Sequence, residues 1–206
     1  RSCLVLPVAR TVPGYHDERR DVGFPDPGHL LHPYTERRYH VQQRSGNHLA
    51  SAYLARTNTT EAQVAEIEPG VLMLNMRDNR GGSRAVATTR DLGKTWYEHP
   101  SSRSALQEPV CMASLIHVDA KDNITGKDLL IFSNPNTTKG RNHITIKVST
   151  DGGMTWPLSN QVTLDEDESW GYSCLSMIDK ETVGIFYESS VAHMTFQAVK
   201  LNDLVQ

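Results

Sequence analysis

The hydrophobic residues from about position 57 onward fall into short runs that are separated by turn-forming residues. These runs are rich in Val, Ile, Leu and Met, and most are four to eight residues long. They span residues 62–68, 70–77, 83–89, 111–118, 128–133, 143–149, 173–178, 183–187 and 193–200. Turn sequences such as Glu-Pro-Gly, Asn-Pro-Asn and Asp-Gly-Gly stand between them. Since no stretch keeps a convincing helical period, the pattern predicts an all-β sandwich, barrel or propeller.

The first part of the chain has a different pattern, which divides the sequence into residues 1–54 and 55–206. Paired arginines interrupt the apolar runs of the first part, and prolines fall at positions 7, 13, 25, 27 and 33. Composition alone favours a poorly structured arm here. The second part carries the predicted strands.

Composition excludes several classes of protein. The 206 residues have a formal net charge of −3, which argues against a nucleic-acid binder. No apolar run approaches the roughly 18 residues of a membrane-spanning helix. Three cysteines without a Cys-x-x-Cys pair argue against a disulfide framework or a zinc ribbon, and we expect Cys111 and Cys174 to be small buried residues. The histidines lack metal-ligand spacing, so we predict no metal site. The chain begins at Arg1, which we interpret as a removed leader or a piece of a longer protein.

One octet pattern, Ser/Thr-x-Asp-x-Gly-x-Thr-Trp, occurs twice at a spacing of sixty positions. Its defining residues are Thr89, Asp91, Gly93 and Trp96 in the first copy, and Ser149, Asp151, Gly153 and Trp156 in the second. Asp accepts backbone N–H bonds inside a tight turn, Gly allows a positive φ, and Trp packs beneath the hairpin. The octet resembles the Asp-box of Asp-box propellers, in which it has a structural role on the outer rim. Two copies at this interval predict a repeated four-stranded sheet, as in the blades of a propeller.

Strand order then predicts a site. In an antiparallel pair, the start of the first strand and the end of the second lie at the same edge of the sheet. First strands start near Glu61 and Tyr172, and second strands end at Arg77 and Glu188. If the repeats are blades, all four residues gather at one mouth of the central channel.

Several segments resemble those of bacterial exo-α-sialidases (neuraminidases). They are Thr-Glu-Ala-Gln-Val at 60–64, Leu-Asn-Met-Arg-Asp at 74–78, Gly-Arg-Asn at 140–142, Trp-Gly-Tyr-Ser-Cys-Leu at 170–175 and Gly-Ile-Phe-Tyr-Glu at 184–188. The resemblance implies a six-bladed β-propeller, present here as an incomplete fragment of about three blades. It further implies an enzyme that removes terminal sialic acid with retention of configuration, without a cofactor. The substrates would be sialylated glycoproteins, glycolipids or oligosaccharides, and the protein would be secreted, periplasmic or on the surface of a bacterium.

The same resemblance assigns roles to five residues. Sialic acid carries a carboxylate on its anomeric carbon, which would repel a carboxylate nucleophile, and sialidases use a tyrosine instead. Tyr172 matches this nucleophile, and Glu61 matches the base that takes its proton. Arg77 and Arg141 match two of the three arginines that clamp the substrate carboxylate. Glu188 matches the acid that orients the remaining arginine, and Trp170 is expected to be a core or rim aromatic.

Two parts of the family pattern are missing. The sequence contains no Arg-Ile-Pro segment, which supplies the first clamp arginine, and no aspartate in the context of the general acid. We therefore expect this fragment alone to be nearly inactive. Two alternatives stay open: a non-catalytic Asp-box propeller that binds sialylated glycans, and an enzyme that transfers sialic acid instead of hydrolysing it.

Residues 14–49 suggest a further hypothesis, that this segment is a frame-shifted reading of an earlier blade. After a shift of one nucleotide, the codons for residues 42–49 can read Ser-Lys-Asp-Arg-Gly-Thr-Thr-Trp, a complete Asp-box. The alternative is a genuine divergent arm, and sequencing the gene across this segment separates the two.

Overall fold

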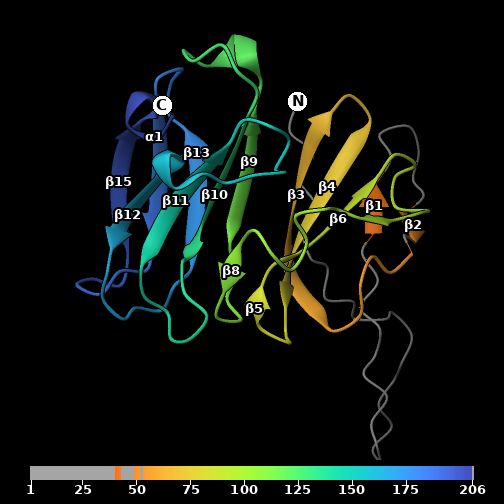
Figure 1. The fold of residues 1–206 in the computed structure, drawn as a ribbon, viewed down its shortest axis with the longest axis horizontal. Helices are drawn as coiled ribbons and strands as arrows, with labels where there is room; N and C mark the ends of the chain where they lie inside the picture. The colour runs from red at the N-terminus through yellow and green to blue at the C-terminus, as the bar shows by residue number, and fades with distance from the viewer. Residues whose placement is uncertain (1–39, 43–48, 52, 206) are drawn as a thin grey trace, which may run out of the picture.

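The computed structural model describes residues 40–42, 49–51 and 53–205, and three antiparallel sheets dominate this part of the chain (Figure 1). The first blade has the order β3 (Thr59–Glu68), β4 (Val71–Asp78), β6 (Ala85–Thr89) and β7 (Tyr97–Glu98). The second has β9 (Ser114–Val118), β10 (Leu129–Pro135), β11 (Ile144–Ser149) and β12 (Gln161–Asp165). The third has β13 (Ser173–Met177), β14 (Thr182–Tyr187) and β15 (Thr195–Lys200). Neighbours in space are thus consecutive along the chain within each blade, apart from the two-residue β5.

Smaller elements connect these sheets. Two two-stranded antiparallel sheets pair β1 (His40–Gln42) with β2 (Leu49–Ser51), and β5 (Gly82–Ser83) with β8 (Gln107–Glu108). Two 3₁₀ turns, η1 (Ala120–Asp122) and η2 (Leu158–Asn160), and one helical turn, α1 (Leu201–Leu204), complete the described elements. In the described residues, no helix has the length and apolar character needed to cross a membrane.

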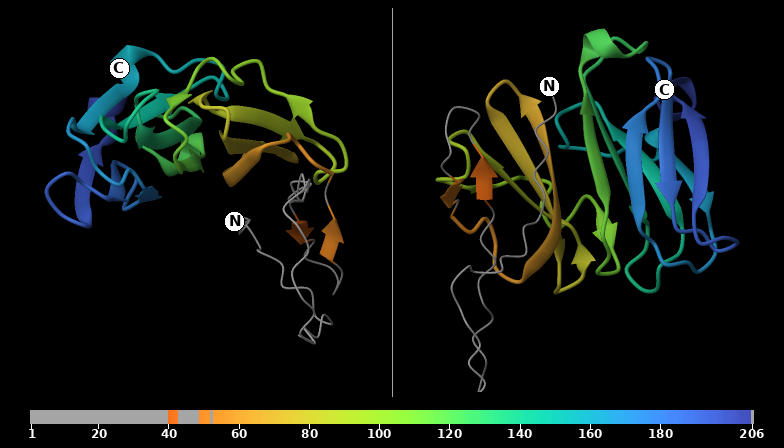
Figure 2. Two further views of the ribbon diagram at one scale, coloured as in Figure 1. Left: turned by 90° about the horizontal axis from the view of Figure 1, so that it is seen from below. Right: turned by 180° about the vertical axis from the view of Figure 1, so that it is seen from behind.

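The three blades follow one another in an arc, with β3, β9 and β13 as neighbouring first strands (Figure 2). The faces between them form two apolar layers. Strand β10 is buried on both sides: Leu130 and Phe132 belong to the layer against the first blade, and Leu129 and Ile131 to the layer against the third. This explains why residues 129–132 are an unbroken apolar run, since alternation is lost where both faces of a strand are covered.

Both Asp-box octets lie between the third and fourth strands of a blade and repeat the same hydrogen bonds. In the second, the hydroxyl of Ser149 donates to Asp151 Oδ1 (2.6 Å) and accepts from Gly153 N (2.9 Å), and Asp151 accepts from the backbone N (2.9 Å) and Oγ1 (2.6 Å) of Thr155. The first octet repeats these four contacts with Thr89, Asp91, Gly93 and Thr95. Trp156 packs edge-on against Phe132 at 5.8 Å between ring centroids, and the indole N–H of Trp96 donates to Tyr53 O (2.9 Å).

The predicted all-β architecture of blade-like sheets is confirmed, and each of the nine predicted runs overlaps an observed strand. In the described residues, the sequence pattern missed β1, β2, β7, β8 and β12. The first four have only two or three residues, and β12 is partly exposed with little apolar content. The predicted division at residue 54 and the shifted-frame hypothesis fall on residues that lie outside the described part, apart from 40–42, 49–51 and 53–54.

Candidate active site

The first blade contributes two of the predicted site residues at one edge. Glu61 sits in an irregularity of β3, where the pairing with β4 shifts between Thr60 and Gln63, and its φ of 37° lies in the left-handed region. A bulge of this kind turns a side chain away from the regular pleat. It points Glu61 toward Arg77 near the end of β4, and Arg77 Nη1 donates to Glu61 Oε2 at 2.5 Å.

The third blade brings the phenol of Tyr172 to the same carboxylate. Tyr172 Oη donates to Glu61 Oε1 at 2.6 Å, although the two residues are 111 positions apart in the sequence. Glu188, just after β14, fixes the backbone of this tyrosine: Tyr172 N donates to Glu188 Oε2 (3.1 Å), and Glu188 N donates to Tyr172 O (2.9 Å). The structure therefore brings together Glu61, Arg77, Tyr172 and Glu188, as strand order predicts.

Arg141, from the turn between β10 and β11, is the fifth predicted residue. Its guanidinium carbon lies 5.6 Å from the centroid of the Tyr172 ring, and its Nη1 donates to Trp170 O at 2.8 Å. The backbone N of Arg141 donates to Glu168 Oε1 (2.8 Å), so Glu168 is a positioning contact that the sequence motif did not reveal. Two arginines thus flank the phenol and its carboxylate partner.

Hydrogen bonding sets the protonation states of the central pair. Burial raises the pKa of Glu61, but hydrogen bonds from Tyr172 and Arg77 outweigh it and bring the pKa below its usual value. The pKa of Tyr172 is raised, chiefly by its hydrogen bond to Glu61 and secondly by burial. The resting site therefore holds a neutral phenol next to an ionised carboxylate, the starting arrangement for proton transfer from tyrosine to glutamate.

Of two cysteines near the site that were expected to be buried, one is buried and one is exposed. Cys111 is fully buried, as predicted, and burial raises its pKa to about 11. Cys174 was predicted to be buried, and this is wrong: it lies on the exposed side of β13, where alternation places Ser173 and Leu175 inward instead. Trp170, expected to be a core or rim aromatic, is two-thirds exposed, and its backbone oxygen accepts from Arg141, so it does not belong to the core.

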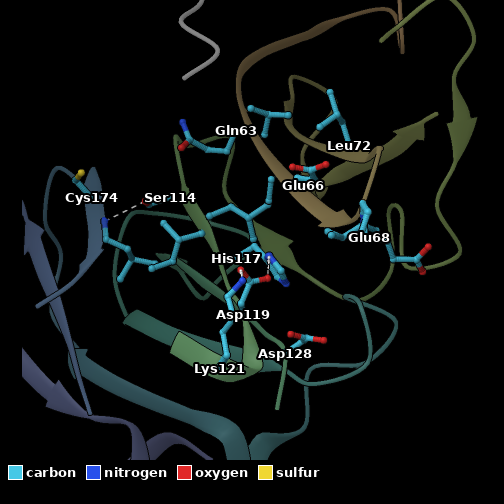
Figure 3. Close-up of a pocket in the computed structure, with 17 residues that line it drawn as sticks. Gln63, Glu66, Glu68, Leu72, Ser114, His117, Asp119, Lys121, Asp128 and Cys174 are labelled. Carbon is cyan, nitrogen blue, oxygen red and sulfur yellow. Dashed lines mark hydrogen bonds and ion pairs between the residues drawn. The ribbon is translucent and has the colours of Figure 1, made fainter. Parts of the chain in front are cut away.

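A cavity of about 740 Å³ runs along the first strands of the blades (Figure 3). Its wall includes Gln63 and Glu66 of β3, Ser114 and His117 of β9, and Cys174 of β13. The five predicted site residues do not line it, although Gln63 and Cys174 lie two positions from Glu61 and Tyr172 in the sequence. The cavity therefore extends from near the site along the inner strands toward their opposite ends.

One group of potential metal ligands lies at the far end of this cavity. His117, Asp119 and Asp128 place one ligand atom each within 4.8 Å of one another. The carboxylates already have protein partners, because Asp128 Oδ1 accepts from Ala120 N (2.7 Å) and Asp119 lies 3.6 Å from the ammonium of Lys121. We assign no metal to this group.

Blades that stack in an arc, Asp-boxes after their third strands and a tyrosine–carboxylate–arginine site define a propeller of the sialidase class. The chain belongs to the family of BNR repeat-like domains, whose profile matches residues 13–187. A sialidase from Bacteroides fragilis is 78% identical over 152 residues, which are 74% of this chain and 28% of that protein. A sialidase from Micromonospora viridifaciens is 34% identical over 131 residues, 62% of this chain and 20% of that protein.

A solved structure shows the same fold. The chain is 65% identical to a Hadza microbial sialidase with a TM-score of 0.77, covering 82% of this chain and 34% of that one. The predicted fold class, an incomplete sialidase-type propeller, is thereby confirmed. The chain spans about a third or less of the length of these relatives.

Proposed function

We propose that this chain supplies the nucleophile, its base and two carboxylate-binding arginines to the active site of a retaining glycosidase that releases terminal sialic acid from glycoconjugates. The observation that carries the proposal is the 2.6 Å hydrogen bond from Tyr172 Oη to Glu61, made between two different blades. A phenol held this way can lose its proton to the carboxylate while its oxygen attacks.

The proposed reaction follows from the positions of these groups. Tyr172 Oη forms a bond to the anomeric carbon as the glycosidic bond breaks, and its proton passes to Glu61. A water molecule then attacks the anomeric carbon and breaks the tyrosyl–sugar bond with net retention; Glu61 returns its proton to the phenol, and the acid that protonated the leaving group takes a proton from this water. Protonation of the leaving group needs a general acid, and we propose that this acid and the first clamp arginine come from outside this chain.

Arg77 gives the substrate a means of activating the base. In the resting site Arg77 pairs with Glu61 and holds the pKa of that carboxyl down. A substrate carboxylate that competes for Arg77 would weaken this pair, and the pKa of Glu61 would rise toward that of a better base. Arg141, beside the Tyr172 ring, would hold the same carboxylate from the other side.

Hydrolysis of a fluorogenic α-sialoside tests the proposal. A longer protein that contains this segment and the remaining blades should release the fluorophore, and this chain alone should show almost none. A fluorogenic galactoside is the matched control, and neither protein should cleave it. Absence of sialoside hydrolysis by a folded longer protein would contradict the proposal and favour a propeller that only binds glycans.

A further inference from the structure

A fully buried ion pair lies beneath the site, and no sequence motif pointed to it. Arg84 directly precedes β6, the third strand of the first blade, and Glu108 is the last residue of β8. Their side chains are both 0% exposed, with Arg84 Nη1 donating to Glu108 Oε2 at 2.7 Å. A buried pair of this kind contributes little net stability, since well-packed apolar residues of similar volume often replace it without loss. The positions of its remaining hydrogen bonds therefore indicate what the pair does.

We propose that Arg84 and Glu108 are positioning residues. They would hold Glu61 and Arg77 of the first blade and Tyr172 of the third blade in their relative positions. That these positions matter for catalysis rests on the function proposed above. The proposal is carried by three sets of contacts, which reach the backbone of Glu61, of the residue after Arg77 and, through Cys111, of the residue before Tyr172. Each contact is to backbone, or to a side chain fixed in the same network, so the pair would act without touching substrate.

The first set holds the strained backbone at Glu61. Arg84 Nε donates to Asn75 Oδ1 (2.7 Å), and Arg84 Nη2 lies within hydrogen-bonding reach of Asn75 O (3.3 Å) and Glu61 O (3.5 Å). Glu61 has a φ of 37°, an unfavourable conformation for a residue with a side chain, which persists only where its surroundings impose it. The guanidinium supplies that constraint directly beneath the irregularity in β3.

The second set holds the strand end that carries Arg77. Glu108 Oε1 accepts from Asp78 N at 2.7 Å, one residue after Arg77. The backbone of Arg84 also joins the neighbouring segment, since Arg84 N donates to Leu106 O at 2.8 Å. Glu108 therefore ties the end of β4 to the same buried cation that reaches Glu61.

The third set extends to the nucleophile through Cys111. Arg84 Nη1 donates to Cys111 O (2.8 Å), and the thiol of Cys111 donates to Gly171 O (3.5 Å). Gly171 has a φ of 84°, and a Cβ on it would lie 2.9 Å from Pro135 Cγ and 3.1 Å from Cys111 Sγ. Because Gly171 is packed against Cys111 and accepts its thiol hydrogen bond, we expect a displacement of Cys111 to shift the backbone that precedes Tyr172.

The test measures the phenol of Tyr172 in this chain, which needs no catalytic turnover. The groups that face this phenol are Glu61, Arg77, Arg141 and Cys111, with Glu188 on its backbone. Tyrosines labelled with ¹³C at Cζ are titrated by NMR, and the Tyr172→Phe variant identifies the signal. In the unmodified chain this signal should titrate above the ordinary value of about 10.

The decisive variant carries Arg84→Met together with Glu108→Leu, which removes both charges and keeps apolar volume. We expect a folded protein in which the Tyr172 pKa moves down toward about 10, because the contact with Glu61 loosens. Lys147→Met is the matched control: Lys147 is also a buried basic side chain against the Phe132 ring (5.9 Å, against 6.0 Å for Arg84), and its replacement should leave the Tyr172 pKa unchanged.

An unchanged Tyr172 pKa in the folded double variant would overturn the proposal. Should that variant fail to fold, Arg84→Lys decides, because lysine keeps the buried charge but cannot reach Asn75, Glu108 and Cys111 together. A folded Arg84→Lys chain with an unchanged Tyr172 pKa would equally refute it. The sialoside assay is a separate test. A Tyr172 pKa that does not respond to the Arg84 and Glu108 substitutions refutes the positioning role. A Tyr172 pKa that does respond, in a segment whose longer protein does not hydrolyse the sialoside, refutes the proposed function instead.

Discussion

Glu61 is the residue on which the site depends, because it accepts from both Tyr172 and Arg77. Replacing it by Gln removes the negative charge and keeps the shape. We predict that the Tyr172 pKa then falls toward about 10, since ionisation of the phenol no longer places two negative charges side by side. Titration of the Tyr172 signal by NMR checks this. An equal pKa in the Glu61→Gln variant would contradict the resting arrangement described here.

Lys147 offers a residue-scale prediction about stability and pH. Its side chain is buried and donates to Asn136 Oδ1 (2.8 Å), and burial lowers its pKa to about 8 from an ordinary value of about 10.5. Between these two values the unfolded chain binds more protons than the folded one, so the free energy of unfolding should rise with pH across this window. Below about pH 8 both states are protonated, and the full cost of burying the charge is present.

Urea unfolding of the unmodified chain and of Lys147→Met between pH 7.5 and 10.5 measures this effect. The unmodified chain should gain stability relative to the variant as pH rises through that range. The buried thiol of Cys111, whose raised pKa has the opposite effect on stability in this range, is present in both proteins and cancels in the difference. Parallel curves for the two proteins would refute a depressed pKa at Lys147.

Sequence reasoning found the residues at strand ends and missed those that support them. Glu61, Arg77, Tyr172 and Glu188 were predictable as a group, because antiparallel pairing fixes which strand ends share an edge. Arg84 and Glu108 were not, since their contact depends on how the chain between β6 and β8 closes over the blade. The exposure of Cys174 depends on which face of β13 turns inward, and a five-residue strand with mixed polarity does not reveal that.

At the scale of elements, the Asp-box should stabilise its blade through its aspartate. Asp151 accepts from Ser149 and twice from Thr155. Asp151→Ala should lower the free energy of unfolding by about 1–3 kcal/mol, as expected for the loss of three hydrogen bonds to a charged group, of which the one from Ser149 is partly buried. Urea denaturation measures the change, with Glu166→Ala at an exposed carboxylate as the control. A loss no larger than that of the control would contradict a structural role for the box.

The turn before β13 tests how tightly the site is packed between elements. Gly171→Ala meets both a positive φ and atoms of Pro135, Arg141 and Cys111 within about 3 Å, whereas Gly70→Ala meets a positive φ with nothing within 4 Å. Gly70→Ala should therefore cost only the backbone strain, about 1 kcal/mol, and Gly171→Ala roughly 1–3 kcal/mol more. Denaturant midpoints compare them. Equal losses would mean that the contacts around Gly171 give way easily.

At the scale of the whole molecule, the repeated octets and evenly spaced strands predicted the blades and their order. The pattern could not show which sheet faces pack against each other, because the positions of the strands along the chain do not reveal which side of each sheet another blade covers. The outer face of the third blade illustrates this: Phe186 and Phe196 lie 4.8 Å apart between ring centroids, and each is about half exposed. In a propeller, a neighbouring sheet covers such a face.

This exposed pair predicts how the chain behaves alone. The Phe186→Ser and Phe196→Ser double variant should bind less of a hydrophobic dye and self-associate less than the unmodified chain, because an apolar patch is removed. Dye fluorescence and light scattering measure the two effects. The exposed Tyr97→Ser change on the first blade is the control and should alter neither.

Sialoside turnover by a Tyr172→Phe variant tests the proposal that Tyr172 attacks the sugar with Glu61 as its base. The substitution is made in a longer protein that contains this segment and cleaves a fluorogenic α-sialoside. Phenylalanine keeps the ring beside Arg141 but removes the oxygen that would attack. We predict that kcat falls by at least about 10³-fold, as for the loss of other nucleophiles. Turnover within a few-fold of the unmodified protein would contradict it.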